Sequence, residues 1–247
     1  MATPTGHAPE FDDAIPKPGS GRRFPLARIA MGIGILALLM ALFLPATRSS
    51  RPAARRVQCV NNMKQIALAL QNYETTYKVP PPLYTVDARG HPLHSWRTLI
   101  LPYLDEEALY KSIDLAKPWN DPVNSRAAES PVNSYRCPEA HGPNNTTTYL
   151  AVAGPEGIVP FAKSRPRAET EDDQKSATVV IEAGEENAVP WMAPVDGDGS
   201  LVVGLGPATK IHHWGGTNMV LADGSVMFLS AKASTEERRR ILSAEVK

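Results

Sequence analysis

The feature that most constrains the fold of this chain is an uncharged, apolar run of 19 residues, from Ile29 to Thr47. Because a helix rises about 1.5 Å per residue, a run of this length can cross the hydrocarbon core of a bilayer, which is about 30 Å thick. We therefore expect a transmembrane helix over 24–47. It would hold the chain in a bacterial cell membrane as a single-pass protein, with the lipid bilayer as its first partner.

Two other interpretations of the run stay open. A cleaved signal peptide would use the weak site at Leu44-Pro45-Ala46, although signal peptides usually have shorter apolar regions and shorter leaders than the 28 residues before Ile29. The second interpretation is that the run forms a buried helix of a soluble protein. Basic residues flank the run on both sides in similar numbers, so charge alone fixes neither the membrane orientation nor the processing of the leader.

The polar leader over 1–23 contains four prolines and few apolar residues, which predicts a disordered segment. Over the whole chain, Lys and Arg number 26, and so do Asp and Glu. This balance provides no net charge to attract a polyanion, so we expect no nucleic-acid partner. The sequence also has no P-loop, no Ser/His/Asp motif and no dinucleotide-binding glycine pattern, which argues against an enzyme.

After Pro52, apolar residues recur every three or four positions, as they do in an amphipathic helix. We expect this helix over 48–79. Pro45 and Pro52 each lack a backbone donor and should kink or interrupt its connection to the membrane span, and the prolines after Val79 should end it. The stripe that should face a core consists of Val57, Val60, Met63, Ile66, Leu70, Tyr73 and Tyr77.

Three segments of the chain are similar to segments of one known family: "AARRVQCVNNMKQIALALQNYE" after the apolar run, "YRCPEA" from Tyr135 and "HHWGGTNMVLADGSVMFLS" from His212. In these segments the chain resembles the family known as domain of unknown function 1559. The last block contains the family's H-X9-DG signature, formed here by His213, Asp223 and Gly224. Members of the family resemble type IV pilins and pseudopilins. The resemblance implies a long amino-terminal helix, half membrane anchor and half packed on a β-sheet head outside the cytoplasm.

The leader departs from the prepilin-like pattern of that family. Arg23 and not Gly stands directly before Phe24, Pro25 follows it, and Arg28 stands where the family has a Glu. In pilins that Glu is thought to pair with the amino terminus of a neighbouring subunit, so its replacement argues against prepilin processing and filament entry. The resemblance implies other pilin-like subunits or a secretion-type assembly as partners, whereas the departures favour a free-standing anchored head.

Short apolar runs separated by Gly, Pro and Asn predict an antiparallel sheet, and with the long helix an α+β, pilin-like fold. We expect a β-rich head over 80–232 and a short carboxyl-terminal helix over 233–247. Within the head, 95–114 predicts an amphipathic helix interrupted near Pro102, and Asp223-Gly224 predicts a type I′ hairpin turn. The expected strands are 147–152, 178–182, 201–203, 218–222 and 225–229.

Histidines and carboxylates near the signature are candidates for a metal site. Asp223 either satisfies the turn geometry or acts as a carboxylate ligand. His213 either packs in the core or binds a metal together with Asp223 or Glu182. Because neighbouring residues of a strand point to opposite faces, only one of His212 and His213 should take part. The turn and packing interpretations are the ones we favour.

A second candidate lies at Asp196 and Asp198, which place oxygen donors at alternate positions, as a calcium loop does. The segment lacks the Gly and the distant Glu of an EF-hand, so a flexible polar loop is the favoured alternative. We therefore expect no catalytic residue and no cofactor, with calcium as the ion to test.

The chain has two cysteines, Cys59 on the amphipathic helix and Cys137 in the head. If the head is exported, we expect a disulfide between them that ties the helix to the head; reduced, buried thiols are the alternative. The favoured function is a membrane-anchored, extracytoplasmic, pilin-like protein with a structural or assembly role. The alternative is a membrane-tethered ligand-binding or metal-dependent enzymatic domain that uses Glu182, His213 and Asp223.

Overall fold

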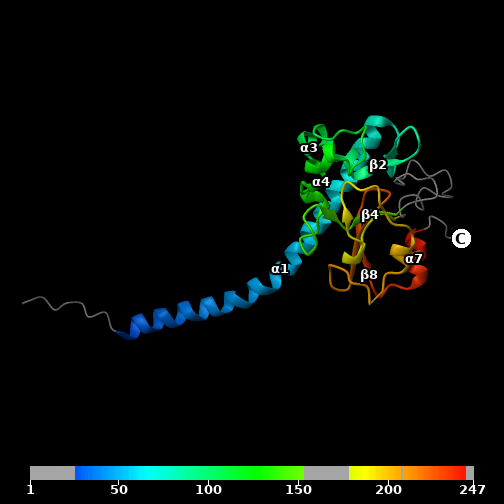
Figure 1. Ribbon diagram of the computed structural model, residues 1–247. Helices are drawn as coiled ribbons and strands as arrows, with labels where there is room; N and C mark the ends of the chain where they lie inside the picture. The colour runs from blue at the N-terminus through cyan, green and yellow to red at the C-terminus, as the bar shows by residue number, and fades with distance from the viewer. Residues whose placement is uncertain (1–25, 153–177, 207, 243–247) are drawn as a thin grey trace, which may run out of the picture. The chain divides into compact units, whose positions relative to one another are not determined.

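A computed structural model describes residues 26–152, 178–206 and 208–242, without the side chains of 27, 41–52 and 178. The predicted leader over 1–23 and the last five residues of the predicted carboxyl-terminal helix lie outside this range. The chain divides into two compact units, 1–49 and 50–247. The architecture mixes helices with antiparallel sheets, which confirms the α+β class (Figure 1).

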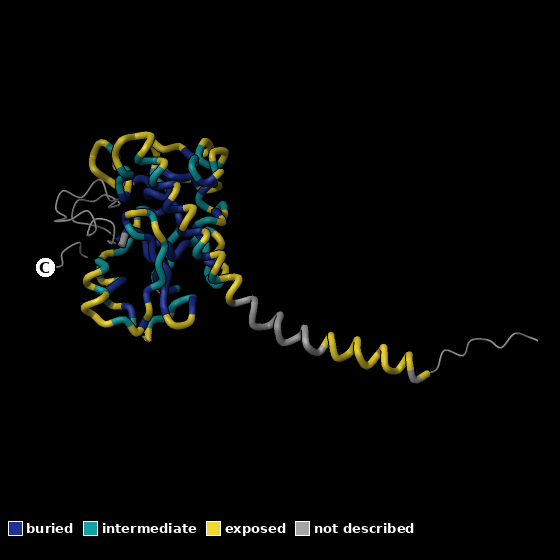
Figure 2. Tube along the Cα trace, turned by 180° about the vertical axis from the view of Figure 1, so that it is seen from behind, coloured by how far each residue is buried: buried dark blue, intermediate teal, exposed yellow. Residues whose placement is uncertain are grey.

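Helix α1 spans Leu26–Tyr77 and continues through Pro45 and Pro52, so the prolines do not interrupt it, and a kink is the part of the prediction that remains. A proline removes one backbone donor, and the hydrogen bonds of the neighbouring turns can hold the helix together across it. Up to Met40 the described side chains of α1 are exposed, including Ile35 and Leu38 (Figure 2). Within the described residues, the structure contains no helix that is both long enough and apolar enough for a membrane crossing.

The second half of α1 buries one stripe in the unit 50–247. The stripe consists of Cys59, Met63, Ile66 and Leu70, whose spacing of four, three and four positions keeps them on one helical face. Two predicted members of the stripe, Val57 and Tyr77, are exposed. The stripe is therefore rotated from the predicted one at its amino end, where Cys59 replaces the two valines.

The main sheet has four antiparallel strands in the order β4-β5-β7-β8. Their bounds are Tyr149–Ala151, Thr178–Glu182, Gly216–Leu221 and Val226–Ser230. Alternation along the strands gives the sheet two apolar faces. One face, which includes Val180 and Val220, packs with α1 in the larger core. The other, which includes Ile181 and Met219, packs with α6 (Ser200–Val203) and α7 (Thr235–Leu242).

Short elements complete the head. Two small antiparallel pairs form, β1 with β2 and β3 with β6, and three short helices lie between them along the chain. Their bounds are Tyr84–Val86 for β1, Pro92–Ser95 for β2, Trp96–Leu99 for α2, Glu107–Lys111 for α3, Ser125–Glu129 for α4, Thr146–Thr147 for β3 and Val189–Pro190 for β6. The predicted helix over 95–114 is thus α2, a 3-10 turn that contains Pro102, and α3.

Two local predictions in the head were wrong. The segment 201–203 was expected as a strand but belongs to α6, where Val202 is fully buried against the second face of the sheet. The hairpin turn at Asp223 is not type I′, because Gly224 has a φ of 84° but Asp223 does not have a positive φ. The backbone hydrogen bonds between the two sides of the hairpin end with the one from the Leu221 N–H to the Ser225 oxygen. This leaves a three-residue loop over 222–224, whose last residue is the left-handed glycine.

A fully buried arginine ties the short elements to the sheet. Arg97 lies in α2, and its guanidinium forms a 2.6 Å ion pair with Asp196, whose side chain is 7% exposed. The remaining guanidinium N–H groups donate to backbone carbonyl oxygens of Tyr149, Trp191, Ala193 and Val195. All five guanidinium donors therefore have acceptors, which is the condition under which a charged side chain can be buried.

Candidate functional site

Four buried side chains with metal-ligating atoms meet between α1 and the sheet. Cys59 comes from the buried stripe of α1, Cys137 from the loop before β3, Glu182 from the end of β5, and His213 from the loop before β7. One ligand atom from each side chain lies within 4.8 Å of the other three. We refer to these four residues as the Cys-His-Glu cluster; it is the one group of three or more such residues within the described part of the chain.

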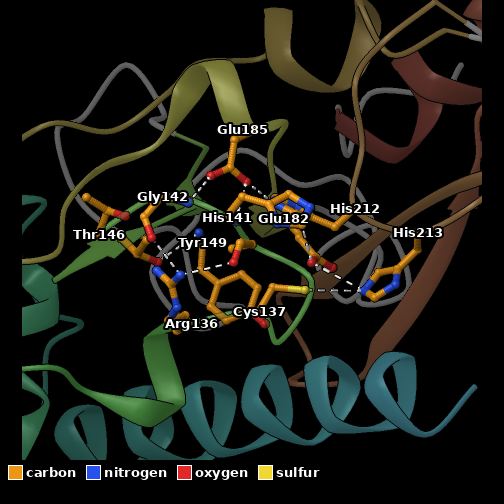
Figure 3. Close-up of polar contacts among 12 residues, drawn as sticks. Arg136, Cys137, His141, Gly142, Thr146, Tyr149, Glu182, Glu185, His212 and His213 are labelled. Carbon is orange, nitrogen blue, oxygen red and sulfur yellow. Dashed lines mark hydrogen bonds and ion pairs between the residues drawn. The ribbon is translucent and has the colours of Figure 1, made fainter. Parts of the chain in front are cut away.

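The distances inside the cluster are those of polar contacts. Nε2 of His213 lies 3.3 Å from Oε1 of Glu182 and 3.7 Å from Sγ of Cys137 (Figure 3). Both cysteines are free thiols, so the predicted disulfide is not formed in this structure, although the prediction paired two residues whose sulfur atoms are close. The cluster therefore brings together one residue of α1, two loop residues and the last residue of β5.

Electrostatics favour a charged pair in the cluster when no ion is bound. Burial alone would lower the pKa of His213, but its hydrogen bonds with Cys137 and Glu182 and the charge of the Glu182 carboxylate raise it to about 9. Burial would also raise the pKa of Glu182, yet hydrogen bonds from His213, Cys137 and Asn218 hold it below its usual value. The contact with Cys59, together with burial, raises the pKa of Cys137. The metal-free cluster is therefore an imidazolium–carboxylate pair beside a protonated Cys137 thiol.

The strands position Glu182 from two sides. Tyr149 of β4 is its direct cross-strand partner, and Asn218 of β7 donates from Nδ2 to Oε2 of Glu182 at 2.8 Å. Thr217 donates a short hydrogen bond to the backbone oxygen of Glu182. Burial and the nearby Glu182 carboxylate raise the pKa of the Tyr149 hydroxyl, which stays protonated. These contacts leave Oε1 as the Glu182 atom that faces the two thiols and the imidazole.

The loop that carries Cys137 is held by side-chain bonds to its backbone. Asn62 of α1 donates from Nδ2 to the backbone oxygens of Asn133 and Arg136, at 3.2 and 2.8 Å. Arg136 in turn donates to the carbonyl oxygens of Ala140, Gly142 and Pro143, which closes the loop after the cysteine (Figure 3). The Asn62 bonds therefore fix the backbone before Cys137 relative to α1, and the Arg136 bonds fix the shape of the loop after it.

His212 belongs to a second polar group next to the cluster. Its Nε2 lies 2.7 Å from Oε2 of Glu185, which also accepts a 2.7 Å hydrogen bond from the Gly142 backbone at Oε1. Nδ1 of His212 is 3.7 Å from Oε1 of Glu182. As predicted, only one of the two histidines, His213, belongs to the Cys-His-Glu cluster, but strand alternation is not the reason, because both residues precede β7. Both rings lie near Glu182.

The structure separates the other predicted candidates from the cluster. Asp223 lies in the turn at the far end of β7, where its Oδ1 accepts from the Ser225 backbone and its backbone oxygen accepts from Gln71. The predicted set of Glu182, His213 and Asp223 is therefore not assembled. Oδ1 of Asp196 accepts from Arg97, Trp96 and the Ala151 backbone, so this carboxylate is a structural ion-pair partner. Asp198 is exposed and accepts from the Ser200 backbone.

A protein-family model described as a protein of unknown function (DUF1559) matches residues 48–207, about two thirds of the chain. The chain belongs to the DUF1559 family. The comparisons found no match to the chain among curated proteins or among solved structures. The DUF1559 match begins just after the apolar run and covers Cys59, Cys137 and Glu182, but it ends before His213. Most of the Cys-His-Glu cluster therefore lies within the family region.

Proposed function

We propose that this DUF1559 protein is anchored in the cell membrane by the first half of α1, with a pilin-like head outside the cytoplasm and a structural or assembly role. One observation supports this proposal most directly. In a single helix, the side chains from Ile29 to Met40 are apolar and exposed, whereas the stripe from Cys59 to Leu70 is buried in the core. Exposed apolar side chains in such number mark a surface that contacts lipid or protein.

The sequence of the same segment fits the lipid alternative. The run from Ile29 to Thr47 carries no charge, and basic residues occur on both sides of it. The leader lacks the Gly and the Glu of prepilins, which favours an anchored head that stands alone over a filament subunit. An oxidising location would also allow Cys59 and Cys137 to form the predicted disulfide by exchange with a disulfide oxidant, which is itself reduced to a dithiol.

Two charges placed in the middle of the run test the anchor. Each Arg at the centre of a membrane span costs about 2.5–3.5 kcal/mol on the insertion scale, so Leu38→Arg with Leu39→Arg should abolish stable insertion. The wild type should stay in the membrane pellet after an alkaline wash, and the double variant should leave it. Val123→Arg is the control, because Val123 is a 57% exposed apolar residue of the head. A wild type in the soluble fraction, or a double variant that stays in the pellet, contradicts the anchor.

The assembly role requires a separate experiment. A lysine-reactive crosslinker applied to intact membranes should link the head to other chains, which mass spectrometry of the products would identify. Recovery of the monomer alone, at crosslinker levels that link a known membrane complex in the same cells, would leave the anchor intact and refute the assembly role.

The second candidate function is a ligand-binding or metal-dependent enzymatic head. The observation that favours it is the meeting of Glu182 and His213, with a cleft of about 570 Å³ on the far side of β5 lined by Glu182 together with residues such as Leu201, Leu205 and Lys210. Asp223 is not available to this group, because it lies at the other end of β7. We place this candidate second because the cluster is buried away from solvent.

A further inference from the structure

We propose that the Cys-His-Glu cluster is a structural metal site that binds one Zn²⁺ through Cys59, Cys137, Glu182 and His213. The proposal concerns the head alone and holds whether or not the first half of α1 enters a membrane. The site differs from both predictions made from the sequence. It uses the two cysteines as metal ligands and not as a disulfide, and it combines Glu182 and His213 with these cysteines and not with Asp223.

The first argument is the convergence of four ligand atoms of the right kinds. All four side chains are buried, and their ligand atoms lie within 4.8 Å of one another, as the corners of a tetrahedral site must. They come from α1, from two loops and from the end of β5, so no local hydrogen-bonding motif accounts for their meeting. Packing alone would place apolar side chains between a helix and a sheet.

The second argument is a buried carboxylate oxygen that no well-formed hydrogen bond satisfies. Oε1 of Glu182 has only ion-pair contacts, 3.3 Å to Nε2 of His213 and 3.7 Å to Nδ1 of His212, and the buried Tyr149 hydroxyl next to the cluster also lacks a hydrogen-bond partner. Oε2 of the same carboxylate is bonded to Asn218, so the lone pairs of Oε1 are the ones left over. Buried polar groups without partners are rare in native proteins and often mark an ion or a water. A cation held by Oε1 and the two sulfur atoms would satisfy it.

The third argument is that the surroundings fix the ligands before any ion arrives. Asn218 orients the Glu182 carboxylate, and Asn62 and Arg136 hold the backbone on either side of Cys137. Nδ1 of His212, whose Nε2 is bonded to Glu185, lies 3.7 Å from Oε1 of Glu182. Such outer contacts are typical of metal sites, where they set the orientation of the ligands.

The donor set selects the metal. Two sulfur ligands and one imidazole suit Zn²⁺, whereas calcium and magnesium require oxygen ligands. Four protein ligands complete a tetrahedron and leave no position for water or substrate, so the ion would be structural and not catalytic. On binding, the two thiols and the imidazolium release their protons to solvent, and the ion joins α1 to β5 and to both loops.

The test uses the full chain, purified in detergent, reduced and treated with a chelator. Titration with Co²⁺ alone should give a thiolate-to-cobalt charge-transfer band that saturates at one ion per chain, and Zn²⁺ should displace it. Cys137→Ser and His213→Gln should each weaken Zn²⁺ binding by at least about 100-fold, because the loss of an outer contact alone costs roughly 10- to 100-fold. Asp223→Asn is the matched control; it changes the other residue of the signature and should bind as the wild type does.

Two results would overturn the proposal. One is a reduced wild-type chain that shows no charge-transfer band with excess Co²⁺, a result that does not depend on whether any variant folds. The other is binding that survives in both ligand variants. Intact mass, before and after reduction, provides the remaining comparison. If chain isolated from its host contains the Cys59–Cys137 disulfide, two mass units lighter and without zinc, the thiols are not metal ligands in the cell.

Discussion

The buried Arg97 gives the most stringent test of how the head is held together. Its guanidinium pairs with Asp196 at 2.6 Å and donates to four backbone carbonyl oxygens, with no exposure to solvent. The backbone oxygen of Arg97 also accepts a 2.6 Å hydrogen bond from the buried Tyr135 hydroxyl. Its partner Asp196 supports the same junction, because that carboxylate also accepts from Trp96 of α2 and from the Ala151 backbone of β4.

The expected cost of removing it follows from these contacts. Breaking a buried ion pair by deleting one partner costs about 3–5 kcal/mol, because the remaining charge stays buried without compensation. Each buried acceptor left without a donor adds about 1–3 kcal/mol, although such terms are not additive. Arg97→Ala should therefore lose most or all of a free energy of unfolding that is typically about 5–15 kcal/mol. Arg97→Lys keeps the charge but offers three donors instead of five, and we expect a loss of about 3 kcal/mol.

Urea unfolding of the full chain, followed by tryptophan fluorescence, measures the loss. Arg126→Lys in α4 is the matched control, since Arg126 is exposed, and it should stay within about 0.5 kcal/mol of the wild type. An Arg97→Lys variant as stable as this control would refute the reasoning, because the two additional donors and the planar guanidinium would then contribute nothing.

Two further predictions concern the hairpin and the cluster. Gly90 and Gly224 have φ values of 85° and 84°, but an added Cβ meets nothing within 4 Å at Gly90 and collides with the Gln71 amide at Gly224. Gly90→Ala should therefore cost about 1 kcal/mol for the left-handed backbone alone, and Gly224→Ala about 1 kcal/mol more for the lost Gln71 hydrogen bond; equal urea midpoints would contradict this. In the reduced, metal-free chain, the pKa of His213 is raised from 6.5 to about 9. The pairing of His213 with Glu182 therefore makes its full contribution to the free energy of unfolding below pH 6.5, and this contribution is lost as the pH rises to about 9. His213→Gln should remove this alkaline loss, and a wild-type stability that increases between these pH values would contradict the assignment.

The sequence predicted those parts of the fold that depend on local periodicity. Alternation around Val220 and Val226 identified the β7–β8 hairpin, and the helical spacing of Met63, Ile66 and Leu70 identified the buried stripe. The same spacing would have placed Cys59 on that stripe. The Asp-Gly pair could not show whether Ala222 belongs to the strand or to the turn, so the turn type was missed.

Contacts between distant segments could not be predicted in this way. Arg97 has no local signal in its sequence context, because its partners lie 52 to 99 positions further along the chain. Asp196 was grouped with Asp198 from their spacing alone, whereas its carboxylate pairs with Arg97. Cys59, Cys137, Glu182 and His213 were each singled out, but as a disulfide and a separate metal set, since only the folded sheet and α1 bring the four together.

Labelling of a new surface cysteine tests the central claim, an anchored head outside the cytoplasm. Both natural cysteines are 0% exposed, so the wild-type chain should react little with a membrane-impermeant maleimide. Ala108→Cys places a thiol on the exposed surface of α3. We predict that intact spheroplasts label this variant and that the labelled chain stays in the alkali-washed membrane pellet. Labelling only after the cells are lysed, or a labelled chain in the soluble fraction, would contradict the account.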